Sequence, residues 1–161
     1  MNTNFSFAAA VAVVAFITPM AGYAADEYNV STGVTTSGVP LGVQGVDTVA
    51  LSNFHAFAYG DATHTVVNDG VAYYFSSAEF ARLFEDQPEV YLPQYGGFCA
   101  YAVALGKKFD GNPRFADIVD GKLYLFVNAA ILEEYRKDKE YVIMTADSMW
   151  TNIQNTPVED L

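Results

Sequence analysis

Alternation of apolar and polar residues predicts a β-hairpin over residues 62–77 (ATHTVVNDGVAYYFSS). Both arms are rich in Val, Thr and aromatic residues, and the Asn-Asp-Gly run between them is typical of a tight turn. With that turn, Val66 faces Tyr73 and His64 faces Phe75 across the two strands. His64 is therefore expected on the apolar face of the hairpin.

A second hairpin is predicted over residues 114–127 (RFADIVDGKLYLFV), with Ile118 opposite Leu123. Apolar residues at helical spacing predict four helices around the two hairpins. The first helix has Ser76 and Glu79 at the spacing of a capping box, and the third has Asn128 as its cap. Two hairpins interleaved with short helices predict a small, single α+β domain. The helices are expected over residues 76–87, 98–106, 128–139 and 140–153.

The chain is expected to divide into four parts. Residues 1–24 contain a short apolar run followed by small residues and are interpreted as a signal peptide, which predicts a periplasmic or secreted protein. Residues 25–42 are rich in Ser, Thr and Gly and are interpreted as a flexible leader. Residues 43–155 form the folded domain, and residues 156–161 a C-terminal tail. No internal repeat is recognised in the sequence.

Charge narrows the range of partners. The chain has 19 Asp and Glu against 8 Lys and Arg, a net charge of −11. This balance argues against nucleic acid or an anionic membrane as a partner, because both require basic patches. It is compatible with a metal cation or another cationic ligand, and it is more typical of a solvated acidic surface. No motif for a nucleophilic elbow, a zinc-protease helix or a phosphate loop is present.

Several motifs resemble the YHS-domain family, in particular its small exported single-domain members. The resemblance rests on YYFSSAE, LFEDQPEVYLPQYGGFCAYAV and IVDGKLYL, and extends over about residues 45–151. It implies a compact α+β domain of treble-clef-like type and a role in binding metals, often copper. The cysteines of metal-binding relatives are replaced here by Ala50, Ser76 and Phe80, so a thiolate cage cannot form at those positions.

Cys99 is the only cysteine, so it cannot form a disulfide within the chain. His64 and Cys99 are candidate metal ligands, for copper or another transition metal, because Cu(I) accepts as few as two ligands. Tyr95 and Tyr101 are candidate ligand-binding residues beside them. If a helix begins just after Gly97, its dipole favours the thiolate form of Cys99. The alternative is that Cys99 and His64 are packed in the core, and His55 is interpreted as a surface or packing residue.

Three classes of function follow from these residues. The first is an exported binding module for a metal ion or small ligand, with no catalysis evident. The second is a thiol-based redox enzyme centred on Cys99, for which no partner cysteine exists. The third is a partner-binding domain that has lost the metal site.

Overall fold

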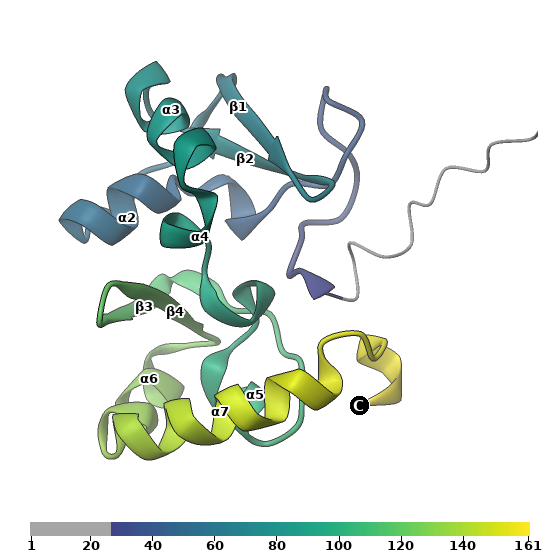
Figure 1. The fold of residues 1–161 in the computed structure, drawn as a ribbon, viewed down its shortest axis with the longest axis vertical. Helices are drawn as coiled ribbons and strands as arrows, with labels where there is room; N and C mark the ends of the chain where they lie inside the picture. Colours follow the sequence, from purple (N-terminus) through teal and green to yellow (C-terminus); the bar gives the residue numbers. More distant parts are fainter. Residues whose placement is uncertain (1–26) are drawn as a thin grey trace, which may run out of the picture.

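The structure is a computed structural model that describes residues 27–161, so the predicted signal peptide lies outside the described residues. Within this range the chain forms helices and two antiparallel two-stranded sheets, which confirms the α+β fold. Figure 1 shows two parts, one above the other, which are called the first and second halves here. The first half contains η1 (Val43–Gly45), α2 (Thr48–Phe54), β1 (Asp61–Asn68), β2 (Val71–Phe75), α3 (Ala78–Asp86) and α4 (Pro88–Tyr91). The second half contains η2 (Gln94–Gly97), α5 (Ala100–Ala104), β3 (Asn112–Val119), β4 (Lys122–Phe126), α6 (Ala129–Arg136) and α7 (Lys139–Ile153), followed by η3 (Val158–Asp160).

The two halves repeat one structural unit, although no internal repeat is recognisable in the sequence. Each unit runs from a 3-10 turn through a short helix and a hairpin to two further helices. Both ladders are interrupted at the same place, between Asp61 and Thr65 in β1 and between Asn112 and Ala116 in β3. A shared irregularity of this kind is stronger evidence for a repeat than shared regular elements, because bulges are specific features of a fold.

The bulges also share their local hydrogen bonds. The Asp61 Oδ1 atom accepts from the backbone N–H of Thr63 at 2.8 Å, and the Asn112 Oδ1 atom accepts from that of Arg114 at 3.0 Å. Such short polar side chains bind the backbone two residues further on and so stabilise an irregular strand start. Each hairpin then turns at an Asp-Gly pair with both residues at positive φ.

The bulge in β1 changes one predicted pairing. Val66 pairs with Tyr73 as predicted, but the residue opposite Phe75 is Asp61 and not His64. The prediction for His64 was wrong because it assumed a regular two-residue alternation along the whole strand. In the second hairpin, Ile118 pairs with Leu123 as predicted.

Helix α3 begins one residue later than the capping box predicts. The Ser77 Oγ atom, and not that of Ser76, accepts from the backbone N–H of Phe80 at 3.2 Å. Ser76 is instead bonded to Asp47, which removes it from the helix end. The predicted cap of α6 is confirmed, because Asn128 Oδ1 accepts from Ile131 N at 3.0 Å.

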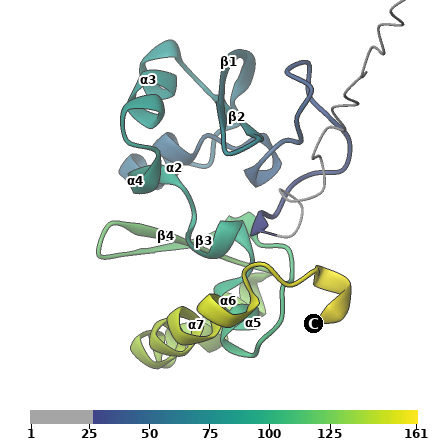
Figure 2. The same cartoon turned by 45° about the vertical axis from the view of Figure 1, so that its right-hand side comes forward.

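Strand β4 joins the two halves because its alternate side chains enter two different cores. Leu123 and Leu125 pack with the core of the first half, whereas Tyr124 and Phe126 pack with the core of the second half. All four side chains are buried, so residues 123–126 form a continuous apolar run where a half-exposed strand would alternate. Figures 1 and 2 both show the β3–β4 hairpin lying between the two groups of helices.

The segments expected to be a flexible leader and a tail pack against the domain. The Asn29 side chain is buried and donates to the carbonyl oxygens of Gly97 and Gly111, both at 3.0 Å. At the other end, Lys108 Nζ donates to the carbonyl oxygen of Thr156 at 2.7 Å. Both segments therefore contribute to the folded unit.

Candidate functional site

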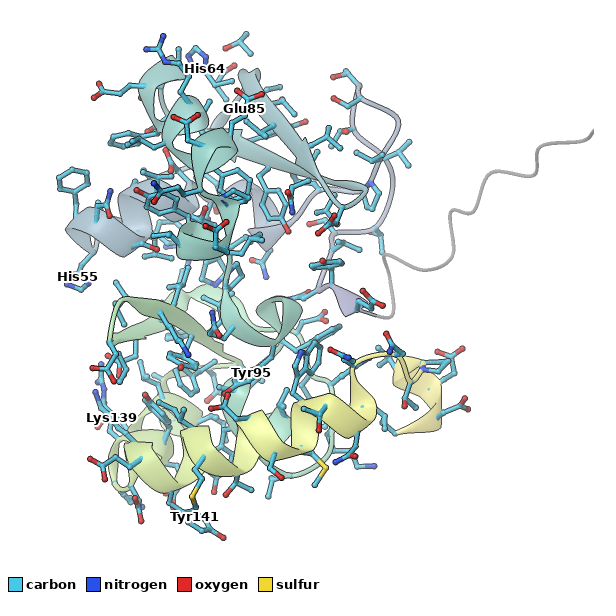
Figure 3. The ribbon with its side chains drawn as sticks, in the orientation of Figure 1. His55, His64, Glu85, Tyr95, Lys139 and Tyr141 are labelled. Atoms are coloured by element: carbon cyan, nitrogen blue, oxygen red, sulfur yellow. The ribbon has the colours of Figure 1, made fainter. Side chains whose placement is uncertain are left out.

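The first predicted site residue, His64, lies on β1 in the first half. Its side chain is only partly buried, and it lies within the irregular segment between Asp61 and Thr65. Figure 3 shows His64 at the outer end of the first half and Tyr95 in the second half, beside α7. His64 therefore lies on the β1–β2 hairpin of the first half, away from the core of the second half.

Cys99 lies in that second core and is fully buried. It bridges to Leu125 of β4, and its N–H donates to the carbonyl oxygen of Phe109 at 2.8 Å. It precedes α5 as the N-cap residue, with extended backbone and no capping bond from its side chain. Cys99 was expected in the first turn of the helix, but it lies one residue before that turn, and α5 is only five residues long. Cys99, before α5 in the second half, and His64, on β1 in the first half, are consequently not brought together.

The repeat gives a physical reason for the position of Cys99. Asp47 occupies the equivalent position in the first half: it caps α2, and its N–H donates to the carbonyl oxygen of Ala58 at 2.9 Å. Asp47 is also fully buried, but its carboxylate binds Ser76. The second half has Val127 in the place of Ser76, so the thiol packs at a position where the first half has a polar contact.

Tyr95 and Tyr101, the other predicted ligand-binding residues, are packing residues of the second core. The Tyr95 hydroxyl donates to Asp147 Oδ1 at 2.8 Å, and its ring packs edge-on against Trp150. Burial, with the neighbouring Asp147 carboxylate, holds the pKa of Tyr95 well above its usual value. Tyr101 is partly buried and packs against the same core.

The part of the chain that the structure describes contains no cluster of side chains suited to bind a metal ion. No group of three or more His, Cys, Asp or Glu side chains in residues 27–161 is arranged to hold a metal ion. The same residues contain no helix with the length and apolar character needed to cross a membrane.

A cleft between the two halves contains the most distinctive group of side chains. It has a volume of about 260 Å³ and lies between the end of α2, strand β3 and the end of α6. We call it the inter-half cleft. Its walls combine apolar side chains with a histidine, two arginines and one acid, and contain no Ser, Thr or Cys nucleophile. The lining residues are Leu51, His55, Phe57, Pro113, Arg114, Ala116, Asp117, Ile118 and Arg136.

Arg114 is held in place by an aromatic ring. Its guanidinium carbon lies 4.2 Å from the centroid of the Phe57 ring, which is a close cation–π contact. None of the ion pairs formed within residues 27–161 includes Arg114. A guanidinium that stacks on a ring keeps its N–H groups, at the edge of its plane, available for an acceptor.

The other charged groups of the cleft are paired. Asp117 Oδ2 lies 2.5 Å from Lys139 Nζ, so its negative charge is offset by a lysine from α7. Arg136 lies 2.6 Å from Glu133 on the same helix, and both side chains are largely exposed. Exposed pairs of this kind contribute little to stability, so Arg136 can exchange Glu133 for another acceptor at low cost.

His55 completes the cleft from the first half. It ends α2 in the left-handed conformation, with φ of 51°, and its N–H donates to the carbonyl oxygen of Leu51 at 3.1 Å. In Figure 3, His55 and Lys139 lie on the same side of the molecule, above and below the β3–β4 hairpin. His55 is exposed, in agreement with its interpretation as a surface or packing residue, but no local signal places the end of α2 beside a strand some 60 residues later.

A second cavity, of about 420 Å³, lies between the β3–β4 turn and α7. Three of its lining residues are acids, Asp120, Glu140 and Asp147, with Lys122 as the only base among them. This character follows the acidic composition of the whole chain. The inter-half cleft departs from that composition and is therefore the better candidate for a specific site.

Comparisons with known proteins identify no relative of this chain. No family model matches it, and neither the curated proteins nor the solved structures contain a significant match. Its function is therefore inferred from the geometry of its own residues.

Proposed function

We propose that the protein is a binding module for a small organic molecule, which it holds in the inter-half cleft without catalysing a reaction. The observation that carries this proposal is the combination of an apolar wall, formed by Leu51 and Ile118, with polar groups from both halves. Small-molecule sites are concave, with apolar walls and a few convergent polar groups, and this cleft combines five apolar lining residues with four polar ones.

A small organic ligand is favoured over a metal ion for two reasons. His64 and Cys99, the strongest candidate metal ligands, lie on different parts of the fold. The cleft itself offers one histidine and one carboxylate, and Lys139 already pairs with that carboxylate. A stable transition-metal site needs more donors than this.

The thiol-redox alternative has less support. Cys99 is fully buried and the chain has no second cysteine. Reactive thiols, by contrast, are partly exposed and lie in electropositive surroundings. The partner-binding alternative would use exposed apolar residues such as Tyr141 and Met144 on α7. It predicts a stable complex with a second protein, whereas the binding proposal predicts saturation by a small molecule alone.

Membership of the YHS-domain family and export to the periplasm or medium are part of this proposal. The first is supported by the quoted motifs and the second by the apolar run in residues 1–24. Mass spectrometry of the protein from its native host is expected to give a mature chain that begins near Ala25. An intact Met1 in the membrane fraction would contradict export.

A cleft-filling variant tests the binding site. Ala116 lines the cleft, and Ala116→Phe is expected to fill it. Thr65 is the matched control, because it follows the bulge in β1 as Ala116 does in β3. Thermal melts are recorded with small organic acids, amines and neutral compounds, and circular dichroism confirms that both variants fold. A ligand at saturating concentration is expected to raise the midpoint by about 3–6 °C for the wild type and Thr65→Phe.

The same ligand is expected to leave the midpoint of Ala116→Phe unchanged. The proposal fails if no compound stabilises the wild type, or if Ala116→Phe is stabilised as much as Thr65→Phe. Stabilisation by Cu(I) or Zn²⁺ alone would favour the metal-binding alternative.

A further inference from the structure

We infer that the inter-half cleft selects a compact organic oxyanion, whose carboxylate or phosphate group is held between the guanidinium groups of Arg114 and Arg136. This inference rests on the proposed function and adds the chemical class of the ligand. His55 lines the same cleft from the first half and is expected to donate a further hydrogen bond to the anion.

The distribution of positive charge is the first argument. The chain has only three arginines, and two of them, Arg114 and Arg136, line the cleft. In a protein of net charge −11, this concentration is a local exception. Guanidinium groups match a pair of carboxylate or phosphate oxygens with two parallel N–H bonds, which a lysine cannot provide.

The pairing of the nearby acids is the second argument. Asp117 is the one acid in the cleft wall, and its pairing with Lys139 at 2.5 Å leaves it less able to neutralise the arginines. Arg114 is stacked on Phe57 and has no carboxylate partner among residues 27–161. Arg136 is joined to Glu133 only through an exposed pair. An entering anion can therefore bind the Arg114 guanidinium, which Phe57 orients, and the Arg136 guanidinium, which leaves Glu133 at low cost.

The size and walls of the cleft define the rest of the ligand. A volume of about 260 Å³ is below the range of drug-sized pockets and suits a single ring or a short chain. Leu51, Phe57 and Ile118 offer apolar contact on the walls. The ligand is thus expected to combine one anionic group with a small apolar body.

Four probes with the same ring separate charge from shape: benzoate, phenyl phosphate, benzamide and benzylammonium. Each is titrated into the isotope-labelled protein and followed by NMR. We expect one or both anions to bind at least tenfold more tightly than benzamide, with shifts at the end of α2 and the start of β3. The two anions distinguish a carboxylate site from a phosphate site. Raising the salt concentration should weaken the binding of the anions and leave the binding of benzamide unchanged.

Arginine variants then assign the site. Arg114→Gln and Arg136→Gln are each expected to weaken anion binding about tenfold or more, since hydrogen bonds to charged groups contribute that much. Arg114→Lys keeps the charge and is expected to restore binding only in part. Arg82→Gln is the matched control, because Arg82 is the third arginine and lies exposed on α3, away from the cleft.

The possible outcomes separate this inference from the proposed function. If benzamide or benzylammonium binds in the cleft as tightly as the anions, the oxyanion inference is wrong and the binding proposal stands. Anion binding that Arg82→Gln weakens as much as Arg114→Gln also overturns the inference, because it shows attraction by overall charge. If neither these probes nor the wider panel of compounds binds, both proposals fail.

Discussion

The carboxylate of Asp47 joins helix α2 to the end of strand β2 through Ser76. Its Oδ2 atom accepts hydrogen bonds from the backbone N–H of Ser76 at 2.7 Å and from its hydroxyl at 2.6 Å. The Oδ1 atom accepts from the backbone N–H of Ala50 at 2.9 Å and so caps α2. One fully buried carboxylate therefore fixes α2 in place. The C-cap residue of this helix, His55, lines the inter-half cleft.

Asp47→Ala is expected to lower the free energy of unfolding by about 2–4 kcal/mol, since it removes a helix cap and leaves buried donors without an acceptor. Urea unfolding monitored by circular dichroism measures this change. Glu85→Ala is the control: it removes an equal charge from an exposed position on α3 and should change the free energy by less than about 0.5 kcal/mol. Equal effects of the two substitutions would mean that charge, and not the hydrogen bonds of Asp47, determines the loss.

Cys99 is expected to be inert in the folded protein. It is fully buried, so a thiol reagent such as DTNB should modify it only when the protein opens. The reaction should be slow in buffer and rapid in concentrated urea. Cys99→Ser is expected to lower the free energy of unfolding by about 1–3 kcal/mol, because it places a hydroxyl in an apolar core. Fast modification of the native protein would contradict the buried position of Cys99 and would favour the redox alternative.

Local sequence signals predicted the hairpins, their Asp-Gly turns and the cap of α6, because each depends on neighbouring residues. The pairings of Val66 with Tyr73 and Ile118 with Leu123 follow from those turns. The position of His64 could not be predicted in the same way, because a bulge interrupts the alternation. Both bulges begin at a short polar side chain, Asp61 in β1 and Asn112 in β3, whose bond to the backbone two residues further on stabilises the irregular strand start.

The repeat and the cleft were missed for a different reason. Equivalent positions of the two halves carry unlike residues, such as Asp47 and Cys99, because one is polar and bonded while the other is packed. The cleft joins His55 to Arg114 and Arg136, which are far apart in sequence. Only the packing of β3–β4 between the halves brings these side chains together.

Stability is expected to fall at alkaline pH because several tyrosines are buried. Burial is the main cause that raises the pKa values of Tyr73 and Tyr95 above the ordinary value of 10.0. The folded state thus retains protons that the unfolded chain releases above about pH 10, so the free energy of unfolding decreases as the pH rises. Each such tyrosine contributes a slope of up to about 1.4 kcal/mol per pH unit.

Urea midpoints measured between pH 7 and pH 11 test this dependence. The midpoint should stay nearly constant to about pH 9 and then fall. Tyr95→Phe should reduce the steepness of that fall, whereas Tyr59→Phe should not, because Tyr59 is 62% exposed. An identical slope for the wild type and Tyr95→Phe would show that other groups cause the alkaline transition.

Folding is expected to be independent of metal ions. The two cores consist of buried apolar side chains around the hairpins, and residues 27–161 contain no cluster of three metal-binding side chains. Thermal melts with and without EDTA, or with a Cu(I) chelator, should agree within about 1 °C, unlike those of domains that fold on a structural metal. Loss of helical circular dichroism after chelation would reveal a metal site that these contacts do not include.

Lys108 is expected to fix the end of helix α7. It is 2% exposed, and its Nζ atom donates to the carbonyl oxygens of Gln154 at 2.8 Å and Thr156 at 2.7 Å. The same atom lies 5.5 Å from the ring centroids of both Phe98 and Trp150. A lysine at this position satisfies carbonyls that the helix end leaves without donors.

Lys108→Met keeps much of the side-chain volume but removes the charge and all three donors. It is expected to lower the free energy of unfolding by about 1–3 kcal/mol and to loosen the segment after α7. Trp150 is the only tryptophan, so its emission should shift to longer wavelength as water reaches its ring. The neighbouring Lys107 is exposed, and Lys107→Met serves as the matched control with unchanged emission. Unchanged emission and stability in Lys108→Met would mean that packing around Trp150, and not the lysine, holds the end of α7 in place.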